Sequence, residues 1–184
     1  MTDNFEENKT VARLAEITAL NQGYSPAKSK QIRIAAALHD IGKQKISGEI
    51  LNKPGKLNKR EFEIIKTHTI IGEKMLESIQ GDIGDMARHI CCYHHEWRNG
   101  KGYWGVPSDY LPRYVEIVAV CDVFTALLYK RIYKPAWPPE EALQYIQNQA
   151  GTQFCPELAR DFITLVRTDS RVSAIFAELQ PHEN

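Results

Sequence analysis

The sequence predicts an all-α fold, a single compact helical domain that spans residues 1–184 and contains about seven or eight helices. Apolar residues recur three and four positions apart through most of the chain, which is the period of a helix with one buried face. Proline, glycine and small polar residues stand between these segments, where helices usually begin and end. No stretch has the alternating polar and apolar pattern of a half-buried strand.

Residues 1–42 are expected to form two helices. The apolar face of the first consists of Val11, Leu14, Ala15 and Thr18. This helix is expected to end near Gly23. Ser25 can cap the second helix, because Pro26 then takes the first helical position, and Gly42 is placed to stop it. The apolar face of the second consists of Ile32, Ala35, Ala36, Leu38 and His39.

The middle of the chain is expected to hold two more helices and two loops. A loop containing Gly48, Pro54 and Gly55 comes first. Asn58 can cap the helix that follows, whose shared face consists of Phe62, Ile65, His68, Gly72 and Met75. The next helix is the most regular, and its apolar face consists of Ile83, Met86, Ala87, Ile90, Cys91 and His94. Residues 96–112 are expected to form a glycine-rich loop.

The last part of the chain is expected to be helical again. Pro112 is placed to open a long helix whose apolar side includes Val115, Val118, Ala119, Asp122, Thr125 and Ala126. Residues 137–139, Trp-Pro-Pro, open another helix, which Gly151 closes. Two short helices, around residues 156–166 and 170–179, complete the fold.

Charge balance and cysteine content narrow the function classes. Lys plus Arg and Asp plus Glu both number 23, which gives zero net charge with histidine neutral. This balance argues against a long nucleic-acid partner and leaves a small anionic ligand open. The four cysteines form no C-x-x-C pair and are expected to be reduced, partly buried thiols. Neither a signal-peptide core nor a membrane-spanning stretch is present, so a cytoplasmic protein without membrane contact is expected.

The apolar segment 34–41 contains a histidine followed by an aspartate. His39 and Asp40 are expected to lie deep in the core, where an ionised carboxylate needs a cation or several hydrogen-bond donors. A single buried pair of this kind could be an ordinary core hydrogen bond. Its meaning therefore depends on whether other helices carry similar residues.

Three further helices do carry them. The polar residues that interrupt their apolar faces are His68, His94, His95 and Asp122. Separate hydrogen bonds explain four such sites poorly, whereas one shared cation site explains them together. Nitrogen and oxygen ligands without a thiolate suit iron, manganese, zinc or nickel. Six candidate ligands exceed the needs of one tetrahedral ion, so we expect two divalent ions that could hydrolyse a phosphodiester.

Two sequence motifs resemble those of a known family. Residues 39–43, His-Asp-Ile-Gly-Lys, resemble the signature of the HD phosphohydrolase superfamily, and residues 94–103 resemble the H-H-E-x-x-D-G-x-G-Y-P signature of its HD-GYP branch. Further matches follow in order at 50–56, His68 with Gly72, 117–122, 131–137 and 151–154. The motif-bearing core runs from residue 10 to 166. The resemblance implies a bacterial signalling phosphodiesterase that cleaves cyclic di-GMP or a related cyclic dinucleotide at two or three iron or manganese ions.

The resemblance also implies a role for each matching residue. The family's metal ligands match His39, Asp40, His68, His94, His95 and Asp122. Asp40 matches the carboxylate that bridges two ions, and Lys43 matches a lysine that can offset charge developing on the phosphate. Arg131, Lys134 and Tyr103 match positions assigned to substrate binding. Without the resemblance, the basic residues Lys43, Arg131 and Lys134 would be interpreted as solvated surface charge. The implied reaction uses a metal-activated hydroxide and yields a linear dinucleotide or mononucleotides.

Three departures from the family pattern leave alternatives open. Trp104 stands where the signature has proline, and Asn99 stands where it has aspartate. Asp3 and Glu7 fall where many members have ligands for an additional metal ion. Glu7 is expected to be solvated, so we expect two ions, while a third ion stays an open alternative. One rival interpretation is a module that binds cyclic di-GMP, or a GGDEF-domain partner, without turnover. The other is an HD enzyme that acts on another nucleotide.

Overall fold

The computed structural model describes residues 2–129 and 136–178, with side chains from Phe5 onward. These residues are helical apart from their connections, and the single β feature among them is an isolated bridge between Ala150 and Phe154. The predicted all-α class is therefore confirmed. None of the helices within these ranges has the length and apolar character needed to cross a membrane.

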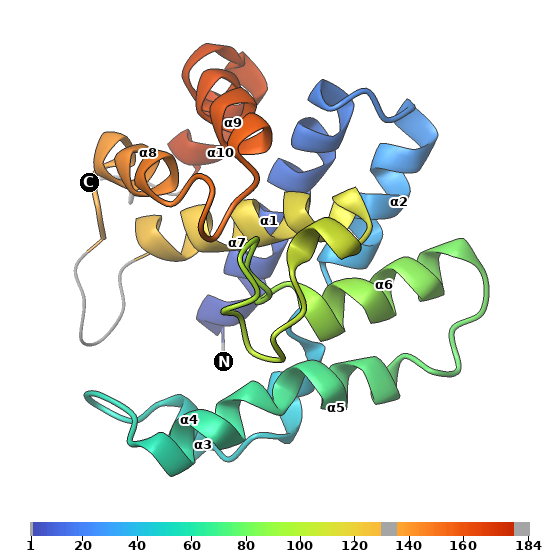
Figure 1. The fold of residues 1–184 in the computed structure, drawn as a ribbon, viewed down its shortest axis with the longest axis vertical. Coiled ribbons are helices and arrows are strands. Elements are labelled where there is room, and N and C mark those ends of the chain that lie inside the picture. Colours follow the sequence, from blue (N-terminus) through green and yellow to red (C-terminus); the bar gives the residue numbers. More distant parts are fainter. Residues whose placement is uncertain (1, 130–135, 179–184) are drawn as a thin grey trace.

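Four long helices form the centre of the molecule. They are α1 (Thr2–Asn21), α2 (Pro26–Ala36), α6 (Asp82–Tyr93) and α7 (Arg113–Leu128). α1 packs against α2 and α7, and α2 packs against α6 (Figure 1). Fully buried members of their shared core include Leu14, Ile32, Ile90, Val118 and Phe124. This packing brings segments that are far apart in the sequence into contact.

A second layer, below the centre in Figure 1, consists of short helices. They are the 3-10 helix η1 (Ile41–Lys45), α3 (Gly48–Leu51), α4 (Lys59–Lys66) and α5 (His68–Met75). α5 packs against both α6 and η1, whereas α3 and α4 contain no buried residue. α5 therefore joins this layer to the central helices.

The C-terminal helices lie above the centre in Figure 1. They are α8 (Pro139–Asn148), α9 (Pro156–Thr168) and α10 (Ser170–Ala177), and a short 3-10 helix, η2 (Ser108–Tyr110), precedes α7. α8 packs against α7 and α9, while α9 and α10 pack against α1. The rings of Phe124 and Phe162 meet edge to face with centroids 5.3 Å apart. These contacts complete the core on the side away from α5.

The predicted helix starts at Ser25 and Asn58 are confirmed. Ser25 Oγ accepts the backbone N–H of Lys28 at 3.2 Å, and Pro26 is the first residue of α2. Asn58 and Glu61 form a reciprocal capping box at the start of α4. Such caps satisfy N–H groups that the first turn of a helix leaves unpaired.

The second helix is shorter than predicted. α2 ends at Ala36 and residues 37–40 form turns, so His39 and Asp40 lie beyond the helix rather than within it. Both are buried as expected, but Ile34 is exposed to solvent, which contradicts the expectation that the whole segment lies in the core. The turn after the helix, rather than the helix itself, places the two polar side chains.

Gly42 does not stop α2; instead it allows η1 to approach α5 closely. A Cβ on Gly42 would lie 1.9 Å from the carbonyl oxygen of His68 and 2.6 Å from the nitrogen of Gly72. Both neighbours are backbone atoms, so no side chain fits there without separating the two segments. The missing side chain thus brings Asp40, the residue just before η1, next to His68, the first residue of α5.

The single helix predicted around residues 58–75 is in fact two helices. α4 ends at Lys66 and α5 begins at His68, with Thr67 between them. The N–H and the hydroxyl of Thr67 both donate to the carbonyl of Ile64, at 3.1 and 2.6 Å. This contact to the third preceding residue tightens the turn and interrupts the regular hydrogen-bond ladder. With α3 in the predicted loop, the described chain has more helical segments than the sequence indicated.

Candidate metal centre

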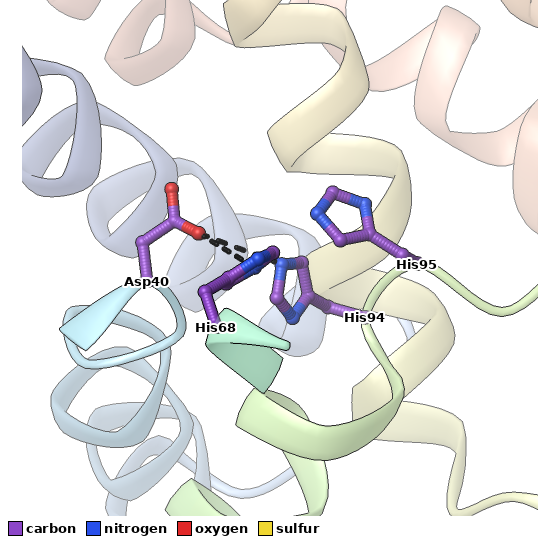
Figure 2. A group of neighbouring side chains, drawn as sticks. All are labelled: Asp40, His68, His94 and His95. Carbon is purple, nitrogen blue, oxygen red and sulfur yellow. Dashed lines mark ion pairs between the residues drawn. The ribbon is translucent and has the colours of Figure 1, made fainter. Parts of the chain in front are cut away.

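The structure brings the six candidate ligands together from four parts of the fold. They lie in the turn after α2 (His39, Asp40), at the start of α5 (His68), just after α6 (His94, His95) and within α7 (Asp122). Their ligand atoms form two overlapping groups: Asp40, His68, His94 and His95, and His39, His94 and Asp122. Within each group these atoms all lie within 4.8 Å of one another. Figure 2 shows the first group, in which the Asp40 carboxylate faces the imidazoles of His68 and His94.

The protein backbone fixes the orientation of three of the imidazoles. In each, Nδ1–H donates to the carbonyl of a residue three or four positions earlier. The pairs are His39 to Ala36 (2.8 Å), His68 to Ile65 (2.6 Å) and His94 to Ile90 (2.9 Å). Because a carbonyl oxygen can only accept, Nδ1 carries the proton in all three. In a neutral ring this leaves the lone pair on Nε2. Metal-binding histidines usually have this arrangement, because the hydrogen bond from the other ring nitrogen fixes the ring and its proton.

Several polar atoms at the centre are buried without a hydrogen-bond partner. Among the described residues they include Nε2 of His39, His68 and His94, and Oδ1 of Asp40. Asp40 Oδ1 lies 3.2 Å from Nε2 of His68 and 3.8 Å from Nε2 of His94. Orphaned buried acceptors are costly, and one shared cation would satisfy them together. The donor set, imidazole nitrogen and carboxylate oxygen, therefore fits divalent metal ions.

The charges at the centre favour ionised carboxylates. Burial alone would raise the pKa of Asp40, but the positive charges of Lys43 and His39 outweigh it and hold this pKa well below its usual value. Burial opposes protonation of His39, yet the nearby Asp40 and Asp122 carboxylates raise its pKa to about 10. In the metal-free protein a proton on His39, together with the positive charge of Lys43, therefore balances the two carboxylates. A bound cation and this proton would compete for the same place.

The environments of His94 and His95 favour the neutral form of each imidazole. Burial lowers the pKa of His94, and His95 and His39 lower it further through like charge. Burial also lowers the pKa of His95, to about 4. Both rings are therefore neutral near pH 7, which is the form that binds metal.

The predicted substrate-binding residues divide into two described and two undescribed positions. Lys43 forms an ion pair with Asp40. Burial alone would lower the pKa of Lys43, but the carboxylates of Asp40 and Asp122 raise this pKa and keep the ammonium group charged. The ring centroid of Tyr103 lies 4.4 Å from that of His95, and burial raises the pKa of its hydroxyl, which stays neutral. Arg131 and Lys134 lie outside the described residues.

Glu7 does not lie in a solvated turn as expected. It is in the first half of α1 and only 8 % exposed, and its charge contributes to the raised pKa of Lys43. It therefore lies near enough to Lys43 for the two charges to interact. The side chain of Asp3, the other candidate for a further ligand, is not among the described ones.

The four cysteines are free, as predicted, and they are buried rather than partly buried. Burial raises the pKa of Cys92 and of Cys121 to about 12 in each case. Thiols with raised pKa values react slowly, because the thiolate is the reactive form.

Two residues near the centre were not identified from the sequence. Glu96 is only 3 % exposed, and its carboxylate accepts the backbone N–H groups of Trp104 at 2.7 Å and Val106 at 2.8 Å. Thr69 is fully buried, and its hydroxyl accepts the indole N–H of Trp104 at 3.0 Å. An acidic residue directly after two candidate ligands could have drawn attention to Glu96. Nothing in the sequence indicates Thr69, because its contact depends on how α5 meets the loop.

This chain resembles a known family and several known proteins over most of its length. The sequence model of a family described as HD domain matches residues 3–158. A cyclic di-GMP phosphodiesterase response regulator of Xanthomonas campestris is 39% identical over 147 residues, which is 79% of this chain and 39% of that protein. A cyclic di-GMP phosphodiesterase of Thermotoga maritima is 37% identical over 164 residues, 89% of this chain and 45% of its own length. A 3'3'-cGAMP-specific phosphodiesterase of Vibrio cholerae is 36% identical over 149 residues, 80% of this chain and 28% of its own. The chain thus spans less than half the length of these relatives.

Solved structures share the fold at lower sequence identity. A protein of Bdellovibrio bacteriovorus, described as an HDG"Y"P protein, superimposes with a TM-score of 0.73 at 20% identity, covering 89% of this chain and 52% of its own. The HD domain of an L. monocytogenes phosphodiesterase, PgpH, in complex with cyclic di-AMP gives a TM-score of 0.63 at 16% identity, with coverage of 100% and 94%. These matches support the helical architecture described above.

Proposed function

This chain belongs to the HD domain family, and from its metal centre we propose that it is a phosphodiesterase that hydrolyses a cyclic dinucleotide. The observation that carries the proposal is the set of six converging side chains, four of whose atoms are buried without a hydrogen-bond partner. The relatives act on cyclic di-GMP or on 3'3'-cGAMP, which supports one of these two as the substrate. We further propose that residues 1–184 form a single domain of this kind.

We propose that the centre holds two divalent ions, iron or manganese, bound by the six residues named above. Asp40 is suited to bridge them because its two oxygens face different ligands. Oδ1 faces His68 and His94, whereas Oδ2 lies 3.4 Å from Nε2 of His39. Nε2 of His39 also lies 3.4 Å from Oδ1 of Asp122. His39 therefore places the second group of ligands next to the carboxylate of Asp40.

The chain's own residues prepare the site for a phosphodiester. Divalent ions at such a centre supply a nucleophile at neutral pH and offset charge on the phosphate. Lys43, charged and paired with Asp40, is placed to donate to a phosphate oxygen as negative charge develops there. Tyr103, neutral and packed against His95, can offer its ring or its hydroxyl to the nucleotide.

The rival functions make different demands on the centre. A module that binds cyclic di-GMP or a GGDEF-domain partner without turnover has no need of a full ligand set, whereas all six positions are retained here and lie together. An enzyme for another nucleotide would keep this centre and differ in the surrounding contacts. Retention of the ligands thus favours catalysis.

The test uses purified protein that has been stripped of metal and reloaded anaerobically with iron or with manganese. We expect hydrolysis of cyclic di-GMP or 3'3'-cGAMP to a linear dinucleotide or mononucleotides, and loss of both metal and turnover in Asp40→Ala. Tight binding of a cyclic dinucleotide without product under both metals would favour the binding module. Turnover of a nucleoside monophosphate alone would favour the other enzyme.

A further inference from the structure

The signature loop is attached to the protein through Trp104, which stands where the family signature has proline. Its backbone N–H donates to Glu96 Oε1 at 2.7 Å, and its indole Nε1–H donates to Thr69 Oγ1 at 3.0 Å. The Thr69 hydroxyl donates in turn to the carbonyl of Lys66 at 2.9 Å, which leaves its lone pairs free to accept from the indole. Although Trp104 is 41 % exposed, it is therefore held at both its backbone and its side chain.

A proline at position 104 could make neither hydrogen bond. It has no backbone N–H for Glu96 and no indole for Thr69. In this chain, hydrogen bonds to two buried residues thus replace the ring stiffness that proline would give. Glu96 also accepts the N–H of Val106, so one carboxylate holds the loop on both sides of Gly105.

Tyr103 is the residue that this attachment holds in place. It precedes Trp104 directly, and its ring contacts those of His95 (centroids 4.4 Å apart) and Phe62 (5.7 Å). The ammonium group of Lys66 lies 5.8 Å from the Tyr103 ring and 5.3 Å from the Trp104 ring. A small displacement of Trp104 would therefore move an aromatic ring that packs on a candidate metal ligand.

We infer that Trp104, through its hydrogen bonds to Thr69 and Glu96, is a positioning residue that holds Tyr103 in place to bind the nucleotide substrate. This inference rests on the proposed function. If Trp104 had a purely structural role, its loss would change stability and metal content. Positioning changes substrate affinity and leaves the metal centre intact.

The test removes the indole hydrogen bond from either side. Trp104→Phe keeps an aromatic ring and the backbone N–H, and Thr69→Val keeps the shape of the side chain. We expect each to raise KM for the cyclic dinucleotide about fivefold, the usual worth of one hydrogen bond, while kcat and bound metal stay within about twofold. Because both changes break the same bond, the double variant should be no worse than either single one. Thr69→Ser, which keeps the hydroxyl that Thr69→Val removes, should behave as wild type.

Thr164→Val is the matched control. The Thr164 hydroxyl also donates to a backbone carbonyl of its own helix, that of Arg160 at 3.0 Å, and α9 carries none of the residues of the proposed site, so this replacement should leave KM unchanged. An unchanged KM in Thr69→Val, or effects of the two single changes that multiply in the double variant, would overturn the positioning role. So would a loss of bound metal that accounts for the whole effect.

A measurement that needs no activity separates this inference from the proposed function. The indole N–H of Trp104, identified by its loss in Trp104→Phe, should exchange slowly with solvent in wild type and quickly in Thr69→Val. Wild type that neither binds nor hydrolyses a cyclic dinucleotide overturns the proposed function and the positioning role together. Active wild type with fast exchange at Trp104 overturns the positioning role alone.

Discussion

Replacing Gly42 with alanine tests how the fold builds the centre. The added Cβ would lie 1.9 Å from the carbonyl oxygen of His68, whereas Cβ atoms in proteins almost never approach other heavy atoms closer than 3.0 Å. η1 must therefore move away from α5 by about 1 Å or more, since overpacked groups are relieved by backbone shifts. That movement carries Asp40 away from His68, now 3.2 Å apart at their nearest ligand atoms.

We expect Gly42→Ala to cost about 1–3 kcal/mol of unfolding free energy, the usual range for overpacking. Metal affinity should fall about 10- to 100-fold, as it does when the residues that orient metal ligands are disturbed. Urea unfolding of the metal-free protein measures the first effect, and manganese titration followed by elemental analysis measures the second. Both effects have one cause, so they should appear together.

Gly48→Ala is the matched control for this substitution. A Cβ at Gly48 would meet only the side-chain nitrogen of Asn52, at an ordinary 3.6 Å, and the residue lies in α3, where alanine is favoured over glycine. Its unfolding free energy should stay within about 0.5 kcal/mol of wild type or rise slightly, with metal affinity unchanged. A Gly42→Ala variant that matches this control in both measurements would refute the close-approach argument.

Three further predictions concern two charges of the centre and two buried thiols. Asp40→Asn keeps the side-chain shape but removes the bridging charge, so elemental analysis should find less than half the wild-type metal; full retention would contradict the bridging role. In metal-free protein, the raised pKa of His39 contributes stability that is fully present below pH 6.5 and is lost as the pH rises toward about 10. The urea midpoint should therefore fall across this range, and a flat profile would contradict the raised pKa of His39. Cys92 and Cys121, whose pKa values burial raises to about 12, should be alkylated at pH 8 far more slowly in the native than in the unfolded protein, as mass spectrometry can show.

The sequence predicts those parts of the molecule that depend on local chemistry. Helical spacing and caps such as Ser25 and Asn58 give the helices and several of their ends, and polar residues on apolar faces give the ligands that converge. The break at Thr67 was not predicted, because it depends on a hydroxyl that competes with the helix ladder. The roles of Gly42 and Trp104 were not predicted either, because they depend on contacts with α5 that only the folded chain creates.

The central claim is that six side chains bind shared cations. X-ray absorption spectroscopy of the manganese- or iron-loaded protein tests it most directly. We predict two ions per chain, nitrogen and oxygen neighbours with imidazole scattering, and a metal–metal distance of roughly 3.5–4 Å. Sulfur bound to the metal, or a single ion without a metal neighbour in fully loaded protein, would contradict the claim.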